Sequence, residues 1–229
     1  MVGKYDIVEF VEADAPITEP VTKFGGQPVW LKEPEWPLSR ELGEQMQFIC
    51  QITLDPELLG VTPGRMACLF VTGEEERGFM TATWDPDGGE NAVIVQPGDA
   101  NGAEIVPEAE GPSLYMLVNG RDWQEGAAPC EYAVDLEPGE DTEYVDEDER
   151  SQWSEEDYDS YCDALDGNKV GGTPVFIQSD EFPEGGPWRL LAQIDSAEVP
   201  FYVNFGDAGI GYAFISESGS VGKFLWQCY

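Results

Sequence analysis

The fold depends on a stretch that occurs twice, first as Lys23-Phe24-Gly25-Gly26-Gln27-Pro28-Val29-Trp30-Leu31 and again as Lys169-Val170-Gly171-Gly172-Thr173-Pro174-Val175-Phe176-Ile177. Seven of the fifteen positions that begin at Lys23 are identical at a constant offset of 146 residues. A Gln-Ile pair follows in both copies, at Gln51 and at Gln193. Repetition on this scale indicates a duplicated structural unit. We therefore expect two similar repeats, at about residues 23–96 and 169–229, within one compact domain that spans residues 1–229.

Short apolar runs between turn residues predict a β-rich α+β fold with antiparallel repeats and a few short helices. The 26 glycines and 17 prolines end strands and form turns. We predict strands at residues 28–31, 46–54, 66–71, 78–84, 92–96, 113–118, 131–136, 201–205, 212–215 and 223–229. Asp55 and Ser154 are suited to cap helices, and the second helix should end near Leu165, before Gly167. Residues 5–11 fit either a strand or a helix, and residues 137–150 should form a mobile loop.

Gln51 and Gln193 are polar residues inside otherwise apolar strands, and they occupy equivalent positions in the two copies. A buried amide needs hydrogen-bond partners, and it carries both donors and acceptors. We expect each glutamine to satisfy backbone groups of the bent Gly-Gly loop beside it. A ligand-binding role for the pair is the alternative.

The chain is strongly acidic, with 46 Asp and Glu residues, 11 Lys and Arg residues and a net charge of −35. Such a surface repels nucleic acid and anionic membranes and attracts cationic proteins. Between Glu131 and Asp163 there are 15 acidic residues and one arginine, a charge density about four times that of the remaining chain. This acidic connector between the repeats is therefore a candidate docking face for a basic protein. A solvated surface and adaptation to high salt are alternative explanations.

The candidate partner-binding residues are six carboxylates of this connector: Asp146, Glu147, Asp148, Glu149, Glu155 and Glu156.

The sequence predicts no catalytic, cofactor or metal site. It contains no histidine, which excludes Ser-His-Asp catalysis, Cys-His catalysis and histidine zinc sites. The five cysteines form no CxxC pair, so we expect buried thiols in a reducing compartment. The turn from Gly206 to Gly211 has GxxGxG spacing before a strand, which favours a hairpin turn with positive φ over a phosphate loop. The run that starts at Asp85 departs from a calcium loop at Gln96, where an EF-hand needs glutamate.

No apolar run approaches the roughly 18 residues that a membrane-spanning helix needs. Asp6 and Glu9 interrupt the N-terminal stretch, so it lacks the apolar region of a signal peptide. We expect a soluble cytoplasmic protein.

Several motifs together resemble the YwqG-like family, a bacterial domain of unknown function. They are the Gly-Gly-x-Pro bends, the aromatic-Pro steps at Trp36 and Phe182, Gly206-Asp207-Ala208-Gly209 and the terminal Gln227-Cys228-Tyr229. The resemblance covers about residues 23–229 and is closest from Lys169 onward. It implies a single β-rich domain with two repeats and no established catalytic residues. It also implies occurrence beside toxin genes, where such proteins are proposed to be immunity proteins.

These observations predict a cytoplasmic protein-binding module rather than an enzyme. The leading hypothesis is an immunity protein that neutralises a basic toxin, such as a nuclease, by occluding it. One alternative is an enzyme that acts on a sugar or small molecule at the cleft between the repeats. Another is a salt-adapted housekeeping domain.

Overall fold

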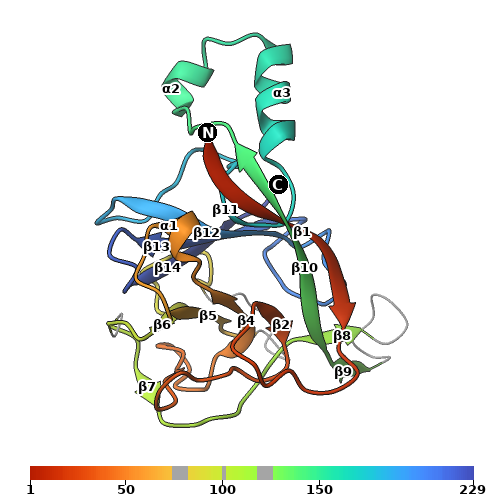
Figure 1. Ribbon diagram of the computed structural model, residues 1–229, viewed down its shortest axis with the longest axis vertical. Helices are drawn as coiled ribbons and strands as arrows, with labels where there is room; N and C mark the ends of the chain where they lie inside the picture. The colour runs from red at the N-terminus through yellow and green to blue at the C-terminus, as the bar shows by residue number, and fades with distance from the viewer. Residues whose placement is uncertain (74–81, 100–101, 118–125) are drawn as a thin grey trace.

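The structure is a computed structural model that describes residues 1–73, 82–99, 102–117 and 126–229. Its main feature is one antiparallel sheet with the strand order β14-β13-β12-β11-β1-β10-β2-β4-β5-β6 (Figure 1). These strands are β1 (Val2–Glu12), β2 (Lys23–Gly25), β4 (Gln47–Thr53), β5 (Met66–Val71), β6 (Asn91–Gln96), β10 (Glu131–Asp141), β11 (Lys169–Gly171), β12 (Trp188–Asp195), β13 (Ile210–Ser216) and β14 (Gly222–Gln227). The prediction of a β-rich fold is confirmed.

The remaining elements are short. Two small sheets pair β3 (Trp36–Pro37) with β7 (Ile105–Val106) and β8 (Tyr115–Leu117) with β9 (Ala127–Pro129). The helices are α1 (Pro56–Leu59), α2 (Glu147–Arg150) and α3 (Glu155–Leu165). No helix among the residues that the structure describes is long and apolar enough to span a membrane.

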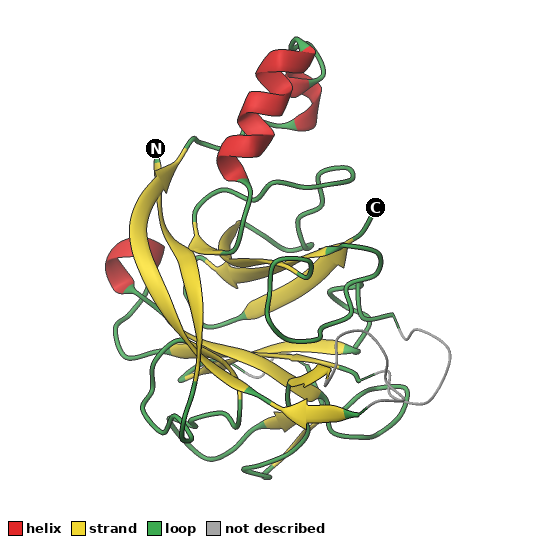
Figure 2. Cartoon of the chain, turned by 90° about the vertical axis from the view of Figure 1, so that its right-hand side faces the viewer, coloured by secondary structure: helices red, strands yellow, loops and turns green. Residues whose placement is uncertain are grey.

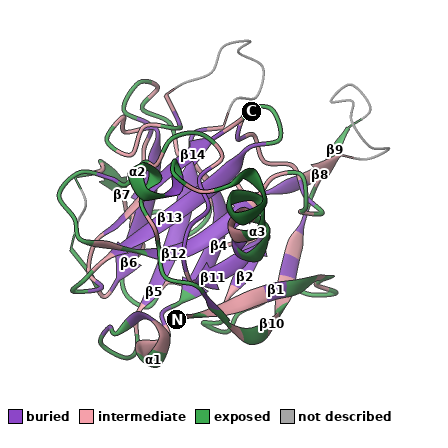
Figure 3. Cartoon of the chain, turned by 90° about the horizontal axis from the view of Figure 1, so that it is seen from above, coloured by how far each residue is buried: buried purple, intermediate pink, exposed green. Residues whose placement is uncertain are grey.

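The large sheet curls until its end strands, β6 and β14, approach each other. The backbone N–H of Asp99, just after β6, donates to the Ser220 carbonyl 3.0 Å away, just before β14. A Cβ atom on Gly222 would lie 2.3 Å from Val93, so β14 packs directly against β6. The sheet is therefore nearly closed, and its concave face encloses the main core (Figure 3).

A long two-stranded ribbon, β1 with β10, forms the middle of the sheet. β1 and β10 pair along almost their whole length, with an irregularity between Ile7 and Glu9. On its other side β1 pairs with β11 through only three residues, and β10 pairs with β2 through three residues. Because β11 and β2 begin the second and first copies of the duplicated stretch, the ribbon joins the two parts of the chain that contain them.

The continuous apolar run of β5 is buried on both faces of the sheet. Ala67, Leu69 and Val71 face the enclosed core, whereas the alternate residues Met66, Cys68 and Phe70 belong to a second cluster with Trp36 and Phe48. A strand covered on both faces needs apolar residues at every position. On β13 and β14 a third cluster, which includes Phe176 and Tyr212, covers the outer face in the same way.

The predicted strand at residues 28–31 is wrong. These residues form a loop that packs over the outer face of the sheet, where Val29 and Trp30 contact the second cluster. Their N–H groups are bonded by glutamine side chains rather than by a neighbouring strand. Oε1 of Gln51 accepts from Val29 at 2.8 Å, and Oε1 of Gln96 accepts from Leu31 at 3.0 Å.

The second copy contains the corresponding hydrogen bonds. Oε1 of Gln193 accepts from the N–H of Val175 at 3.0 Å, and Oε1 of Gln227 accepts from the N–H of Gln178 at 3.0 Å. The amide nitrogen of Gln193 donates to the carbonyls of Leu165 and Gly167. The prediction that Gln51 and Gln193 satisfy backbone groups beside the Gly-Gly bend is confirmed, and Gln96 and Gln227 do the same further along each loop.

Each Gly-Gly bend surrounds a fully buried lysine. Nζ of Lys23 donates to the carbonyls of Ile17 and Gln27 and to the carboxylate of Glu131. Nζ of Lys169 donates to the carbonyl of Leu165, at the end of α3, and to that of Thr173 in the bend, and it lies 2.8 Å from Asp141. Both lysine side chains have no exposed surface.

Asp141, at the end of β10, interacts with three donor groups. Its carboxylate accepts from Nζ of Lys169 and from the backbone N–H of Thr173, and Nζ of Lys4 lies 2.9 Å from its second oxygen. Burial opposes ionisation of this carboxyl, but these donors outweigh burial, so the pKa of Asp141 is lowered. Asp141 is therefore an ionised carboxylate at the centre of the second bend.

The two helix caps and several strands match their predictions. Asp55 caps α1 through the N–H groups of Glu57 and Leu58, and Ser154 caps α3, which ends at Leu165 before Gly167. Residues 5–11 belong to a strand rather than a helix. The GxxGxG turn has positive φ at Gly206 and Ala208, as predicted. Most of the predicted strand at 78–84, and Val118 of the strand at 113–118, lie outside the described residues.

Two further predictions are wrong. Residues 201–205 form only one isolated bridge, Tyr202 to Tyr115, because Phe201 and Phe205 turn into the core. Residues 137–150 are not a mobile loop, because β10 continues to Asp141 and the acidic residues that follow it fold into α2.

The space beside Gly172 predicts a specific cost of substitution. Gly172 has φ of 81°, and a Cβ there would lie 2.4 Å from the Asp141 carboxylate. Gly185 has φ of 82° with nothing within 4 Å of its Cβ position, so it is a matched control. We expect Gly185→Ala to lower the free energy of unfolding by about 1–2 kcal/mol through backbone strain. We expect Gly172→Ala to cost about 1–3 kcal/mol more, measured by urea denaturation. Equal losses would show that the contact with Asp141 contributes nothing.

The lowered pKa of Asp141 predicts how stability depends on pH. A group whose pKa is depressed on folding stabilises the protein above its unfolded pKa, near 3.8, and this contribution is lost as pH falls through the folded pKa. Asp141→Asn should lower the free energy of unfolding by about 3–5 kcal/mol at neutral pH. The difference in free energy of unfolding between this variant and the unsubstituted protein should become smaller below pH 3.8. The exposed Asp163→Asn should change stability by less than about 0.5 kcal/mol.

Candidate functional site

The six predicted carboxylates come together on a helical hairpin that projects beyond the sheet (Figures 1 and 2). We name residues 146–165 the acidic hairpin. It consists of α2, a short turn and α3, and it begins five residues after β10. Asp146, Glu147, Asp148 and Glu149 lie at or in α2, and Glu155 and Glu156 lie in the first turn of α3. All six are exposed.

Helix capping explains why such acidic segments are helical here. Oδ1 of Asp146 accepts from the N–H of Glu149 at 2.9 Å, and Oγ of Ser154 accepts from the N–H of Asp157 at 3.2 Å. The first turn of each helix contains three acidic residues. Carboxylates at a helix N-terminus interact favourably with the helix dipole. Local electrostatics therefore offset part of the repulsion among these side chains.

The hairpin has almost no apolar core. In α3 only Leu165 is buried, and five of its eleven residues are acidic. The ring of Trp153 packs edge-on to Tyr161 with centroids 5.3 Å apart. The guanidinium carbon of Arg150 lies 5.7 Å from the centroid of the Tyr161 ring and 5.9 Å from that of Tyr158. A cation over aromatic faces thus replaces the apolar packing that joins most helix pairs.

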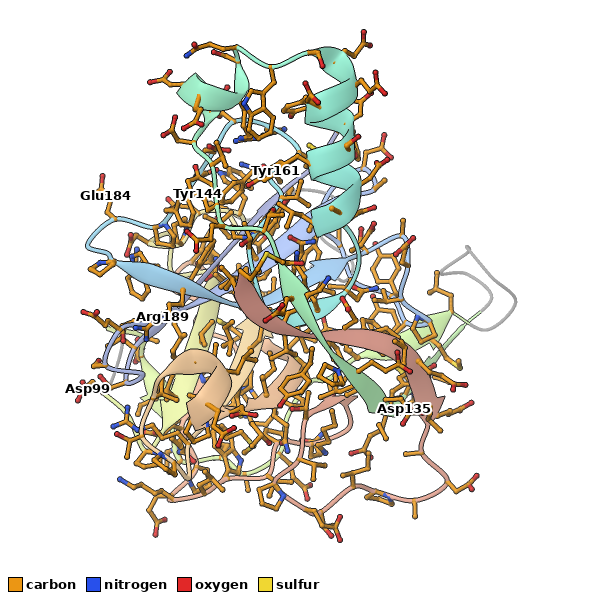
Figure 4. All side chains as sticks on the ribbon, turned by 45° about the horizontal axis from the view of Figure 1, so that its top comes forward. Asp99, Asp135, Tyr144, Tyr161, Glu184 and Arg189 are labelled. Atoms are coloured by element: carbon orange, nitrogen blue, oxygen red, sulfur yellow. The ribbon has the colours of Figure 1, made fainter. Side chains whose placement is uncertain are left out.

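Asp180 attaches the hairpin to the body of the protein. Its carboxylate accepts hydrogen bonds from Arg150 and from the Tyr144 hydroxyl, and also from the N–H of Glu147 at 2.9 Å. The N–H of Asp180 in turn donates to the Glu147 carboxylate at 3.3 Å. Figure 4 shows Tyr144 and Tyr161 together at the base of the hairpin. Asp180 therefore joins α2 to the loop that precedes β12.

We name Asp180 and its contacts with Arg150, Tyr144 and Glu147 the anchor. These contacts shift the pKa values of Tyr144 and Arg150. Burial and the hydrogen bond to Asp180 raise the pKa of the Tyr144 hydroxyl. Burial alone would lower the pKa of Arg150, but its hydrogen bond with Asp180 and the charge of that residue outweigh burial and raise it. Arg150 is 6% exposed, and it is the single basic residue of the acidic hairpin. The hairpin consequently presents carboxylates and no cation to solvent.

The anchor was absent from the sequence-based prediction. Asp180 lies in a polar loop next to the duplicated stretch, and nothing in its local sequence marks it. Arg150 was a usable signal, because a lone arginine among nine acidic residues of a 20-residue segment needs a structural reason.

The sequence predicts that neither the cysteines nor the possible metal ligands form a site. Cys50, Cys68 and Cys130 are buried, as predicted, whereas Cys162 and Cys228 are only partly buried, so the prediction is wrong for those two. Burial raises the pKa of Cys68 and that of Cys130 to about 12. Thiols with such pKa values are protonated and unreactive at neutral pH. No group of three or more Cys, Asp or Glu side chains is arranged to hold a metal in the part of the chain that the structure describes.

The alternative enzyme hypothesis needs a pocket with convergent carboxylates. A cavity of about 250 Å³ lies beside β6 and is lined by Arg40, Asp87, Asn91, Glu104 and Lys223 among others. Lys223 forms an ion pair with Asp87, and Nη1 of Arg40 donates to the carbonyls of Asp87 and Gly88 at 3.0 Å each. The carboxylates that line the cavity are those of Asp87 and Glu104. Because Asp87 is paired with Lys223, the cavity does not offer two free carboxylates.

Comparison with known proteins supplies a family. The family described as "Domain of unknown function (DUF1963)" matches residues 22–221. A search of curated proteins finds no match to the chain.

The anchor predicts that one substitution loosens the hairpin alone. Asp180→Asn removes the charge that pairs with Arg150, so we expect amide hydrogen exchange in α3 to accelerate about tenfold or more, corresponding to about 1–3 kcal/mol of local stability. Exchange in β5 and β13 should not change. Glu184→Gln is the control, because it removes an exposed charge from the same loop. An unchanged exchange rate in α3 would show that Asp180 does not hold the hairpin.

Proposed function

The chain belongs to the DUF1963 family of domains of unknown function, and because that membership assigns no activity, we propose a function from the acidic hairpin: this is a protein-binding module that docks a basic protein. The single observation that carries the proposal is the exposure of all six carboxylates on a projecting element whose only cation is buried. Carboxylates gathered on one projecting element create a local negative potential that a basic surface would complement.

The charge of the whole chain supports a basic partner. A net charge of −35 produces a long-range field that accelerates association with cations and is weakened by salt. Binding at the hairpin would place the partner against an element that stands clear of the sheet. The hairpin can therefore bind a partner without any rearrangement of the core of this protein.

We further propose that the partner is a toxin and that this protein is an immunity protein acting in the cytoplasm. The resemblance of the Gly-Gly-x-Pro and Gly206-Asp207-Ala208-Gly209 motifs to the YwqG-like family supports this. Neutralisation would occur by occlusion, with the carboxylates occupying the basic surface that a nuclease uses for its own substrate.

We also propose that residues 23–96 and 169–229 are two structural repeats of one domain. Three pairs of residues support this, because the two members of each pair make corresponding hydrogen bonds in their own copies: Lys23 and Lys169, Gln51 and Gln193, and Gln96 and Gln227. The acidic hairpin precedes the second repeat, whereas residues 1–22, which precede the first, contain no helix. Partner recognition would thus belong to the segment that separates the repeats.

Charge reversal tests the docking face. The probe is a basic nuclease, titrated by calorimetry at two salt concentrations. Changing all six carboxylates to lysine should weaken binding at least about hundredfold and flatten its salt dependence. The control reverses six other exposed acids: Glu19, Glu33, Glu41, Glu108, Glu184 and Asp207. If both sets had the same effect, net charge rather than the hairpin would cause binding.

The two alternatives have different signatures. An enzyme would bind a sugar or small molecule at the cleft between the repeats. The cavity beside β6 is lined by residues of both repeats, including Asp87 and Lys223, so Asp87→Asn would impair such an enzyme. A salt-adapted domain would unfold at low salt and gain stability in molar KCl, with no partner required. Absence of binding to the basic probe at low salt would contradict the proposed function.

A further inference from the structure

We propose that the free edge of β1, from Val8 to Glu12, binds an extended basic segment of a partner protein as an additional strand. The site lies in the central ribbon and does not include the acidic hairpin. It therefore stands whether or not the hairpin docks a partner.

The edge is free because β11 covers only part of β1. β11 pairs with Lys4, Tyr5 and Asp6, and the N–H of Ile7 donates to the carbonyl of Asn168 at 2.9 Å. The chain then turns away at Gly167, which has φ of 90°. Within the described ranges, no strand pairs with residues 8–12 on the side away from β10.

The ladder geometry shows which backbone groups this edge presents. In an antiparallel pair, successive residues alternate between bonding the partner strand and pointing away from it. The N–H of Ala13 donates to the carbonyl of Glu131 on β10, so the N–H groups of Phe10 and Glu12 point to the opposite side. The N–H of Ile7 also points outward, although Ile7 is an odd number of residues from Phe10. This is possible because the register shifts between Ile7 and Glu9, where Val8 is an extra residue in β1. The open edge thus offers the N–H and C=O groups of Phe10 and Glu12 for strand addition.

The outer edge of β10, the other strand of the ribbon, is less suited to strand addition. Pro138 of β10 lies opposite Tyr5, whose backbone points away from β10 toward Val170. By the same alternation, the position of Pro138 faces the outer edge of β10, where a proline has no N–H to donate. β1 contains no proline between Val2 and Glu12. One outer edge of the ribbon is therefore protected against strand addition, and the other is not.

An open groove runs beside the free edge. It has a volume of about 690 Å³, and its lining includes Asp6 to Phe10 on one side and Glu198 to Pro200 on the other. Figure 3 shows the ribbon at the margin of the molecule, coloured largely as intermediate and exposed. The groove is thus open beside residues 6–10, and Val11 and Glu12 beyond it are exposed.

The side chains along the free edge and the groove specify the occupant. Glu9, Glu12 and Glu198 are exposed acids, while Val8 and Val11 are 53% and 41% exposed. Glu9 and Val11 lie on one face of β1 and Phe10 and Glu12 on the other, so an added strand meets an acid on each face. Lysine or arginine in that strand complements these acids. A second copy of this chain is a poor occupant, because each copy has a net charge of −35.

A heptapeptide probe tests the proposal: acetyl-Lys-Val-Lys-Val-Lys-Val-Lys-amide. We expect it to bind the full chain and to slow amide hydrogen exchange at Phe10 and Glu12. A peptide of the same sequence, methylated at every backbone nitrogen, keeps its charges but cannot form the ladder. It should bind at least about tenfold more weakly.

Matched variants separate the edge from general acidity. Glu9→Lys combined with Glu12→Lys should weaken binding of the probe about tenfold. Glu137→Lys combined with Glu140→Lys, exposed acids on the protected strand, should change it less than about twofold. Equal binding of the methylated peptide, or unchanged exchange at Phe10 and Glu12, would overturn the proposal. So would a concentration-dependent dimer of the chain that protects the same two amides.

Discussion

The structure depends on a buried ammonium group at each of two backbone bends. Lys23 and Lys169 lie in equivalent bends, and each ammonium is bonded by two backbone carbonyls and one carboxylate. A buried charge without partners is very costly, so each bend can adopt only a conformation that surrounds the lysine. The positive φ of both glycines in each bend permits that conformation. Replacing a buried ion pair by apolar groups is often neutral for stability, so the contribution of this arrangement is a defined geometry.

The two carboxylates that complete these bends lie on one strand. Glu131 begins β10 and reaches Lys23, while Asp141 ends β10 and reaches Lys169. The central ribbon is consequently tied to both bends through the ends of a single element. This arrangement explains why β10 is long and regular although much of it is exposed. It also fixes where the chain leaves the sheet, and the acidic hairpin starts a few residues beyond Asp141.

Acidic residues have two separate roles in this chain. Glu131, Asp141 and Asp180 are tied to buried cations and determine where segments lie. Most carboxylates of the acidic hairpin make local capping contacts or none, Glu147 also accepts from the N–H of Asp180, and all six candidate carboxylates face solvent. The first group cannot be removed without leaving a buried charge unpaired, whereas the second can vary with little effect on the core. Variation in the second group would thus be available for partner recognition.

The sequence by itself determined the local structure. The duplicated Gly-Gly-x-Pro stretch, the apolar runs of β5 and β13, the Asp55 and Ser154 caps and the buried roles of Gln51 and Gln193 follow from residue chemistry within short windows. The exposure of Asp146 to Glu149 follows from their charge. Only the tertiary structure decided that residues 28–31 cover the sheet instead of joining it, that Asp180 anchors the hairpin and that β1 keeps a free edge. These features depend on contacts between residues far apart in the chain, such as Gln96 with Leu31 and Asp141 with Lys169. Local propensity does not encode which distant group will supply a hydrogen bond.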